Sequence, residues 1–257
     1  MNIIPAERRA RIMTIINENG FAQVSSLSNE LGVSELTIRR DLQILEKEGG
    51  IIRKRGGAIS RNKNVTMEVP YSIKQVQNPE IKKRIASAAA TLIEDGNSII
   101  LDSGSTTFAL SQLLASRKRL TVVTNDLYIA TKLGMNPDIK LICTGGIIRP
   151  NVFSMQGTLA ENCIRNFSVE YTILGADAIH NEQGIFNVNT EEIPIKQAMI
   201  ESAKKVILLV DSSKFKIRGF AKVCDLSSIH CVITDEGITS DSRKIIRDHI
   251  QNELIIV

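Results

Sequence analysis

VSELTIRRDL, residues 33–42, places two adjacent arginines and an aspartate in a segment that has the residue spacing of a helix. Ser34 is a favourable N-cap residue for this helix. Because successive residues of an α-helix are rotated by about 100°, Ile38 and Leu42 share one face, which we expect to meet a core. Arg40 falls about 200° from Ile38. The sequence therefore predicts a helix from which Arg40 points outward.

The remaining residues of this helix divide between its outer face and its flanks. Thr37 lies with Arg40 toward the outer face, where a side chain reads base edges in a major groove. Arg39 lies on the flank, a position suited to a phosphate contact or a salt bridge. We expect Asp41, at the core edge, to orient an arginine or to pair within the domain. Ile44 also lies toward the outer face, and we expect it to pack under the following hairpin.

Two further helices are predicted before this one. Apolar residues recur at helical spacing over residues 6–19, and Val24, Leu27 and Leu31 mark a second, shorter helix. Gly32 then supplies a tight turn. Two helices joined by a short glycine-containing turn form a helix-turn-helix, a motif that places its second helix in a DNA groove.

A basic hairpin is predicted after the third helix. The stretch IIRKRGGA, residues 51–58, is typical of a β-hairpin with Gly56-Gly57 as its turn. It carries Arg53, Lys54 and Arg55 at or near its tip. Residues 1–59 are therefore predicted to form a winged helix-turn-helix domain.

Positive charge is concentrated in this part of the chain. The 257 residues have a formal net charge of +4, and residues 1–62, with ten Lys or Arg against seven Asp or Glu, account for +3. Such basic clusters suit a polyanion, although an ordinary solvated surface has the same pattern. The clusters are Arg8, Arg9 and Arg11, then Arg39 and Arg40, then Arg53, Lys54 and Arg55. The residues expected to contact double-stranded DNA are Ser34, Thr37, Arg39, Arg40, Arg53, Lys54 and Arg55.

A family resemblance supports this interpretation. Residues 24–58, VSSLSNELGVSELTIRRDLQILEKEGGIIRKRGGA, resemble the N-terminal signature of the DeoR family of bacterial transcriptional regulators. The matching features are the run V-S-x-x-T-I-R-R-D-L and the basic wing that ends in G-G-A. The resemblance implies a transcriptional regulator that binds DNA through this domain.

The rest of the chain is predicted to be a larger α/β domain. Residues 60–77 are polar and weakly patterned and are interpreted as a linker, and Asn78-Pro79 begins a helix. Residues 78–257 then alternate apolar strands with helical stretches, which favours a mainly parallel sheet. The predicted strands are 98–101, 120–123, 140–143, 172–174, 206–210, 231–234 and 254–257, and the predicted helices are 107–116, 127–133, 159–166, 192–203 and 241–250.

Small, polar or acidic residues follow nearly every predicted strand, in the stretches LDSGSTT, VVTND, CTGG, LGAD, LVDSSK and VITD. Ligands of open α/β sheets bind beyond the carboxyl ends of the strands. DSGSTT, residues 102–107, runs into a helix N-terminus and presents N–H and hydroxyl groups to an anion, although a capped strand-to-helix turn has the same residues. No G-K-[ST] follows, so this is not a Walker loop.

Residues 76–257 also resemble the fold shared by ribose-5-phosphate isomerase and the effector domains of the DeoR family. The resemblance implies a pocket for a phosphorylated sugar, closed by the D-x-S-K-F element at residues 211–215. The pairs Glu192 with Lys196 and Asp211 with Lys214 are assigned to it, although each also fits a surface salt bridge. Further candidates to line the pocket are Ile147, Arg149 and Gln156. The residues assigned to the effector site are Asp102, Gly104, Ser105, Thr106, Thr107, Thr124, Asn125, Gly145, Gly146, Asp177, Glu192, Lys196, Asp211 and Lys214.

The resemblance raises the choice between an enzyme and a sensor. The isomerases carry D-G-A-D-E at the corresponding strand end and a K-G-G-G loop downstream, whereas this chain reads LGADA at residues 174–178 and has no such loop. One carboxylate of three remains, and His180 is expected to be a surface residue. We therefore expect no catalytic residue. The alternatives are an isomerase-like enzyme with an appended DNA-binding domain, and an architectural DNA binder indifferent to small molecules.

Other features exclude several classes of protein. The four cysteines form no C-x-x-C pair and share no metal spacing with a histidine, so we expect reduced thiols, mostly in the core, and neither a metal nor a cofactor. No apolar run approaches twenty residues and no signal peptide is apparent, which predicts a cytoplasmic protein without a membrane span. One recognition helix covers only a few base pairs, so binding calls for at least a dimer, and the family resemblance implies a dimer or tetramer. The family resemblance further implies a repressor of a carbohydrate operon.

Overall fold

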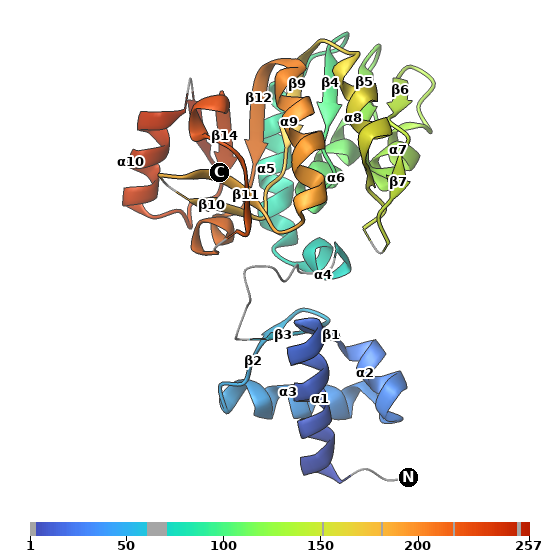
Figure 1. The fold of residues 1–257 in the computed structure, drawn as a ribbon, viewed down its shortest axis with the longest axis vertical. Helices are drawn as coiled ribbons and strands as arrows, with labels where there is room; N and C mark the ends of the chain where they lie inside the picture. Colours follow the sequence, from blue (N-terminus) through green and yellow to red (C-terminus); the bar gives the residue numbers. More distant parts are fainter. Residues whose placement is uncertain (1–3, 61–70, 151, 181, 218, 251–252) are drawn as a thin grey trace. The chain divides into compact units, whose positions relative to one another are not determined.

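The chain folds into two compact units, residues 1–77 and 78–257. The computed structural model, drawn in Figure 1, describes residues 4–60, 71–150, 152–180, 182–217, 219–250 and 253–257. The predicted linker, residues 60–77, contains a short helix, α4 (Tyr71–Val76), and residues 61–70 lie outside the described residues. Part of the predicted linker is therefore regular structure.

The first unit is a winged helix-turn-helix, as predicted. Its three-stranded antiparallel sheet has the order β1-β3-β2, and the first strand, only three residues long, was not predicted. The elements up to residue 60 are α1 (Pro5–Asn19), β1 (Phe21–Gln23), α2 (Val24–Leu31), α3 (Glu35–Lys47), β2 (Ile51–Lys54) and β3 (Gly57–Ser60).

Local sequence signals set the limits of these helices. Gly20 and Gly32 end α1 and α2 in the left-handed conformation, with φ of 72° and 64°. The hydroxyl of Ser34 accepts the N–H of Thr37 at 3.3 Å, which confirms the predicted cap of α3. The buried core of the unit is formed by residues from all three helices and the sheet: Ile12, Ile16, Ala22, Val24, Leu27, Leu31, Ile38, Leu42, Leu45, Ile51 and Ala58.

The wing turns one residue earlier than predicted. Lys54 pairs with Gly57 at the ends of β2 and β3, so the turn is Arg55-Gly56, and Gly56 has a φ of 85°. Gly57 belongs to β3, where a Cβ atom would lie 2.3 Å from the carbonyl oxygen of Ala22. Gly57 therefore allows the unpredicted strand β1 to approach β3.

The second unit is built on a seven-stranded parallel sheet in the order β15-β14-β12-β9-β4-β5-β6. All seven predicted strands are present. Their bounds are β4 (Ser98–Leu101), β5 (Thr121–Thr124), β6 (Lys140–Cys143), β9 (Val169–Leu174), β12 (Ala203–Leu209), β14 (Cys231–Thr234) and β15 (Glu253–Ile256).

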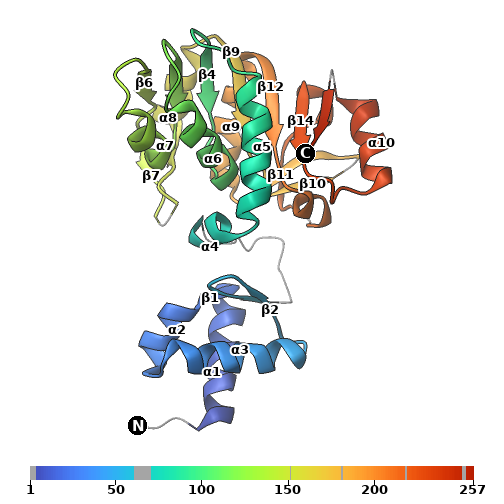
Figure 2. The same cartoon turned by 180° about the vertical axis from the view of Figure 1, so that it is seen from behind.

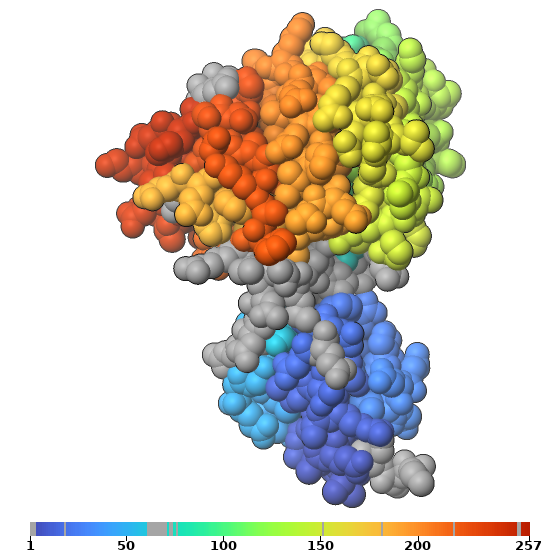
Figure 3. All heavy atoms as spheres, in the orientation of Figure 1, coloured from blue at the N-terminus to red at the C-terminus, as the bar shows by residue number. Residues whose placement is uncertain are grey.

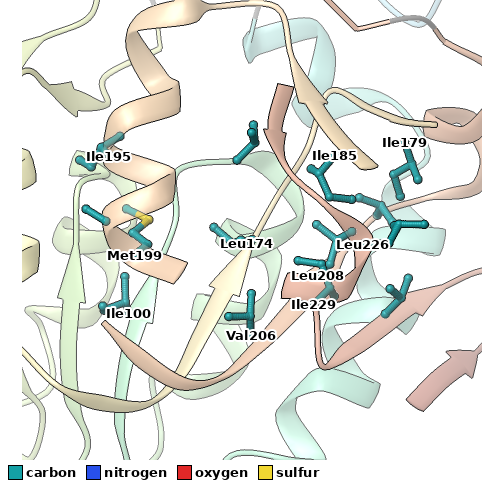
Figure 4. Close-up of a cluster of buried hydrophobic side chains, with 14 of the residues drawn as sticks. Ile100, Leu174, Ile179, Ile185, Ile195, Met199, Val206, Leu208, Leu226 and Ile229 are labelled. Carbon is teal, nitrogen blue, oxygen red and sulfur yellow. The ribbon is translucent and has the colours of Figure 1, made fainter. Parts of the chain in front are cut away.

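Helices cover both faces of this sheet, which explains why its central strands are continuously apolar. Side chains alternate along β4, so that Ile99 and Leu101 belong to one apolar cluster and Ile100 to another. One face carries α5 (Pro79–Thr91), α6 (Ser105–Leu114) and α7 (Leu127–Leu133), and the other carries α8 (Thr158–Arg165) and α9 (Ile193–Glu201), as Figures 1 and 2 show. In Figure 4, Ile195 and Met199 of α9 lie beside Ile100 and Leu174 of the sheet.

Several short elements were not predicted from the sequence. They include a three-stranded sheet of β10 (Ala178–His180), β11 (Gly184–Asn187) and β13 (Ala221–Cys224), and a pair formed by β7 (Ile147–Ile148) and β8 (Met155–Gln156). They also include the 3₁₀ helices η1 (Thr190–Glu192), η2 (Ser212–Lys216) and η3 (Leu226–Ser228). The last helix, α10 (Ser240–His249), was predicted. The unpredicted elements have two to five residues, too few to show a period.

The order of strands fixes where a ligand site is expected. The chain proceeds outward from β4 through β5 to β6, then returns to place β9 on the other side of β4. Such a reversal between adjacent parallel strands is a topological switch point, where the crevice of an open α/β sheet lies. Asp102 directly follows the carboxyl end of β4, and Gly175 directly follows that of β9.

Candidate functional site

The outward face of α3 is the first candidate site. Ile38 and Leu42 are buried, and Arg40 is exposed on the opposite side of the helix, as the sequence predicts. Among the residues that the structure describes, Arg40 has no hydrogen-bond or ion-pair partner. The guanidinium of Arg40 is therefore available to a ligand outside the protein.

Two other predicted DNA contacts on α3 already have partners. The hydroxyl oxygens of Thr37 and Ser34 lie 2.9 Å apart, so both take part in the cap of the helix. Arg39 Nη2 lies 2.8 Å from Glu35 Oε2, one turn earlier on the same helix, and both side chains are about half exposed. Of the two roles predicted for Arg39, the structure contains the salt bridge.

Asp41 pairs within the domain, as predicted. Arg8 Nε lies 2.6 Å from Asp41 Oδ2 and its Nη2 donates to Oδ1 at 3.3 Å, while Arg9 Nη1 is 3.8 Å from the same oxygen, Oδ1. Because Arg8 is only 8% exposed, its assignment to a DNA-facing basic cluster was wrong. Ile44 is 38% exposed, in line with its predicted position toward the outer face, and its packing under the wing stays a prediction.

The wing presents further basic residues to solvent. Lys54 and Arg55 are exposed and have no partner among the described residues. The backbone N–H of Arg53 donates to Glu46 Oε1 at 2.9 Å, and its guanidinium lies 3.7 Å from Oε2 of the same residue. The end of α3 and the wing, light blue in Figure 3, lie on the surface of the unit.

The second candidate site lies at the switch point of the parallel sheet. Asp102 follows β4, and its Oδ2 accepts hydrogen bonds from the N–H of Gly175 at 2.9 Å and from Lys196 Nζ. Lys196 Nζ also donates to the carbonyl oxygen of Gly175 at 3.0 Å. Asp102 is 2% and Lys196 3% exposed. A buried ion pair therefore links the ends of β4 and β9 to α9.

Glu192 belongs to the same cluster but has partners other than Lys196. Its Oε1 lies 2.6 Å from Arg149 Nη1, and its Oε2 accepts from Asn187 Nδ2 at 2.8 Å. The interpretation of Glu192 and Lys196 as a surface salt bridge was wrong, because both side chains are buried and each has a partner distant in sequence. Arg149, a further candidate from the sequence, thus contacts the site.

Lys196 stays charged despite its burial. Burial lowers the pKa of Lys196, but the carboxylates of Asp102 and Glu192 outweigh this effect and hold the pKa above its ordinary value. Asp177, at the end of β9, adds to this effect, and its Oδ2 accepts the N–H of Val188 at 3.1 Å. The switch point therefore combines three carboxylates with two cations.

The predicted anion loop is only partly open to a ligand. Thr107 and Thr124 are fully buried, and their hydroxyls donate to the carbonyl oxygens of Gly104 and Leu101 at 2.8 Å each. Both hydroxyls therefore have partners within the chain, Thr106 is also buried, and the assignment of these three residues as ligand contacts stays a prediction. By contrast, Gly104, the N-cap residue of α6, provides no side-chain cap, and Ser105 in the first turn of the helix is partly exposed. The first-turn N–H groups of a helix have no intrahelical acceptor, so this end remains suited to an anion.

Neighbouring side chains hold this loop in place. The backbone N–H of Ser103 donates to Asn125 Oδ1 at 3.1 Å, and its hydroxyl donates to Asp126 Oδ2 at 2.6 Å. Asp126 also caps α7 through the N–H of Ile129 at 2.9 Å. Burial raises the pKa of Asp126 above its ordinary value, although these hydrogen bonds oppose the shift. Ser103 and Asp126 were not predicted as site residues, although both follow strands within the polar stretches noted in the sequence.

Gly146 and the second predicted pair, Asp211 with Lys214, make contacts within the chain. Gly146 has a φ of 114°, and a Cβ there would lie 2.7 Å from the carbonyl oxygen of Gln156, whereas Gly145, with a φ of 69°, has open space around it. Asp211 caps η2 through the N–H of Ser213 at 3.0 Å, and the N–H of Lys214 donates to the Asp211 carbonyl oxygen at 3.0 Å.

The predicted start of α5 is correct, but its cap is different. Asn78 is left-handed, with a φ of 49°, and makes no side-chain cap; its amide donates to Asp211 Oδ1 at 3.4 Å instead. His180, expected at the surface, is half-buried and lies against Phe186 with ring centroids 4.7 Å apart. Asn187, which contacts Glu192, was missed because it lies on the unpredicted strand β11.

The four cysteines are free thiols. Only Cys231 is buried and Cys143 is exposed, so the expectation that they mostly fill the core was wrong. Burial raises the pKa of Cys224 to about 12 and that of Cys231 to about 11, which keeps both protonated.

Comparison with known families identifies both units. Residues 8–64 match the model of the DeoR-like helix-turn-helix domain, and residues 77–236 match that of the DeoR C terminal sensor domain. The chain belongs to the DeoR family. As a member of this family it is a DNA-binding transcriptional regulator and not an enzyme, which confirms the resemblance seen in the sequence.

Curated relatives match nearly the whole chain. A candidate aga operon transcriptional repressor of Escherichia coli O157:H7 is 37% identical, over 92% of this chain and 88% of the relative. The transcriptional regulator GlpR of Haloferax volcanii is 35% identical over 94% of each chain. The glycerol-3-phosphate regulon repressor of Escherichia coli K12 is 30% identical over 96% of this chain and 98% of the relative.

Solved structures are more distant. The match to ribose 5-phosphate isomerase A of Methanocaldococcus jannaschii covers 54% of this chain and 55% of the isomerase chain. The sequence identity is 20% and the TM-score is 0.40. The match to the eIF2B beta subunit of Chaetomium thermophilum covers 69% of this chain and 55% of that subunit, at 17% identity and a TM-score of 0.44. Neither TM-score is high enough for these structures to bear on the function of the chain.

The described residues contain no group of three or more His, Cys, Asp or Glu side chains that could hold a metal ion. None of the helices in the described part of the chain is long and apolar enough to cross a membrane.

Proposed function

We propose that the chain represses a carbohydrate operon by placing α3 in the major groove of operator DNA, and that a phosphorylated sugar bound at the switch point changes its affinity for DNA. The observation that carries the second part is the ion-pair cluster of buried Asp102, Lys196 and Glu192 with partly buried Arg149. A cluster of charged groups at a switch point is typical of a polar ligand site.

The DNA-binding part rests on the outward face of α3 and on the wing. Arg40 is exposed and unpaired, and Lys54 and Arg55 are exposed basic residues of the wing. An arginine on a recognition helix binds guanine in the major groove, and basic wing residues contact phosphates. Because a single recognition helix covers few base pairs, we infer that a dimer or tetramer binds repeated half-sites.

The effector part rests on the charges around Lys196. Carboxylates such as Asp177 and Glu192 accept hydrogen bonds from sugar hydroxyls, while the uncapped start of α6 at Gly104 suits a phosphate group. Together they fit a ligand with hydroxyls at one end and a phosphate at the other. A relative named as a glycerol-3-phosphate regulon repressor is consistent with a small phosphorylated ligand.

Control of DNA binding requires the effector to prefer one state of the protein. A ligand that binds the DNA-bound and free states equally shifts neither population, however tight its binding. We therefore propose that the phosphorylated sugar prefers one of these two states. Release of the operator, the outcome we expect, requires tighter binding to the DNA-free state.

The test is fluorescence anisotropy on DNA from upstream of the protein's own operon, with excess random competitor and a panel of phosphorylated sugars. Release of specific DNA by one sugar phosphate is expected. Specific binding that no phosphorylated sugar changes would contradict the proposed effector. Failure to bind this DNA specifically would contradict the proposal that the chain represses its own operon.

A substitution in the first turn of α6 tests the phosphate position. Ser105→Glu keeps a side chain that is favourable at a helix N-terminus but places a carboxylate where the phosphate is expected. The variant should bind operator normally and lose release by the sugar phosphate. Ser87→Glu, on the exposed side of α5, is the matched control and should respond like the original protein. A retained response in Ser105→Glu would show that the phosphate binds elsewhere.

A further inference from the structure

The outer face of α3 begins with a leucine that is mostly exposed among the described residues. Leu36 is 59% exposed and is absent from the apolar cluster of its unit. At about 100° per residue, it lies about 160° from buried Ile38, and Arg40, Gln43 and Lys47 lie within about 40° of it. These four exposed residues, Leu36, Arg40, Gln43 and Lys47, form one stripe opposite the core, here called the outer stripe.

The residues of the outer stripe differ in part from the DNA contacts predicted on α3 from the sequence. Thr37, predicted as a base reader, shares its hydroxyl with the Ser34 cap, and Arg39 pairs with Glu35. The side chains of the first two turns that point away from the core and have no such partner are therefore Leu36 and Arg40.

We propose that Leu36 is a specificity-determining residue that reads the 5-methyl group of a thymine in the major groove. This inference rests on the proposed docking of α3 in that groove. The thymine methyl is the apolar group among the base edges of the major groove, and apolar side chains contact it. The N-terminal residues of a recognition helix approach the base edges, and Leu36 lies in the first turn.

Charge around Leu36 selects DNA over an apolar protein partner. Arg40 and Lys47 accompany it on the outer stripe, and the wing of the same unit adds Lys54 and Arg55. An apolar side chain accompanied by cations is complementary to a thymine methyl flanked by phosphates.

Leu36 and Arg40 are separated by about one turn of α3, a rise of about 6 Å. The thymine should therefore lie in the same half-site as the base read by Arg40.

The test uses an operator selected from random duplex DNA by the full-length protein. Each thymine of one half-site is replaced singly by deoxyuridine, which removes only the 5-methyl group, and the dissociation constant is measured by anisotropy. At one thymine the original protein should lose about fourfold in affinity, as expected for one buried methyl group. Leu36→Ala should bind the thymine operator more weakly and show no further loss with uracil at that position.

Two variants control for folding and for general effects. Leu36→Met keeps an apolar side chain and should retain sensitivity to uracil at the same position. Leu159→Ala, at a leucine that is 74% exposed on α8 of the other unit, should reproduce the original pattern. Ala is a strong helix former, so Leu36→Ala at an exposed position is expected to fold.

The outcomes separate this inference from the function on which it rests. If uracil has no effect at any thymine, or if Leu36→Ala keeps the original uracil pattern, Leu36 does not read a methyl group, although specific binding by α3 would stand. If no operator is selected from random DNA, the proposed function fails, and the role of Leu36 fails with it.

Discussion

The two candidate sites hold their charges in opposite ways. On α3 and the wing, Arg40 and Lys54 are exposed and unpaired among the described residues, and Arg39 pairs only with a neighbour one helical turn away. At the switch point, Lys196 is buried and pairs with Asp102, which lies 94 residues earlier in the chain.

The difference follows from the ligand that each site is proposed to bind. A surface that meets DNA needs cations that remain hydrated and free until they bind phosphates and release the counterions of the DNA. A site for a small polar molecule needs charged groups held in fixed directions, which requires burial and many hydrogen bonds. Removing a charge should therefore affect DNA affinity in the first site and folding stability in the second.

The largest effect is expected for Lys196→Met. It leaves the carboxylate of Asp102 buried without its cation and should lower the free energy of unfolding by about 3–5 kcal/mol. Urea denaturation followed by circular dichroism measures the change. Lys244→Met, at an exposed lysine of α10, should change it by less than about 0.5 kcal/mol. The double variant Asp102→Asn/Lys196→Met should recover much of the loss, and equal loss in the single and double variants would show that the ion pair is not the cause.

The next effect compares a buried and an exposed ion pair within the first unit. Arg8→Ala leaves Asp41 buried with only the more distant Arg9 and should cost about 2–3 kcal/mol. Arg39→Ala breaks the exposed pair with Glu35 and should cost about 0.5 kcal/mol or less. Hydrogen exchange of α3 amides measures both costs in this unit alone. Similar costs would remove the distinction drawn between these pairs.

A smaller effect is expected for Arg40→Ala, and it should appear in DNA binding rather than in stability. Loss of a base contact should cost about 1–3 kcal/mol of operator affinity and relax the preference at one base pair. Anisotropy titrations on operator and on random DNA measure both. Equal losses on the two DNAs would make Arg40 a phosphate contact instead.

The smallest effect is expected for Lys54→Ala in the wing. A lost phosphate contact weakens binding to all DNA alike and lowers the slope of log affinity against log salt by about one. Affinities measured across a series of salt concentrations give this slope. An unchanged slope would place Lys54 outside the interface.

The sequence was most informative where structure follows local pattern. The bounds of β4, β6, β14 and α7 were predicted to the residue, and the cap at Ser34 followed from its position before α3. The turn of the wing was misplaced by one residue because the requirement for Gly57 comes from Ala22, in a strand too short to be recognised. A glycine in a turn and a glycine beside another backbone look the same in a sequence.

The sequence by itself determined the family, the two-part architecture and the helix whose outer face is proposed to meet DNA, because periodicity and capping act between residues a few positions apart. Only the tertiary structure decided which charges are free. Arg8 and Arg40 both belong to basic clusters, yet Arg8 pairs with Asp41 in the core of the first unit. Likewise, Lys196 pairs with Asp102 rather than with Glu192, its helical neighbour, because the sheet brings the ends of β4 and β9 beside α9. Whether a charge stays in solvent depends on burial, and burial is a property of the folded chain.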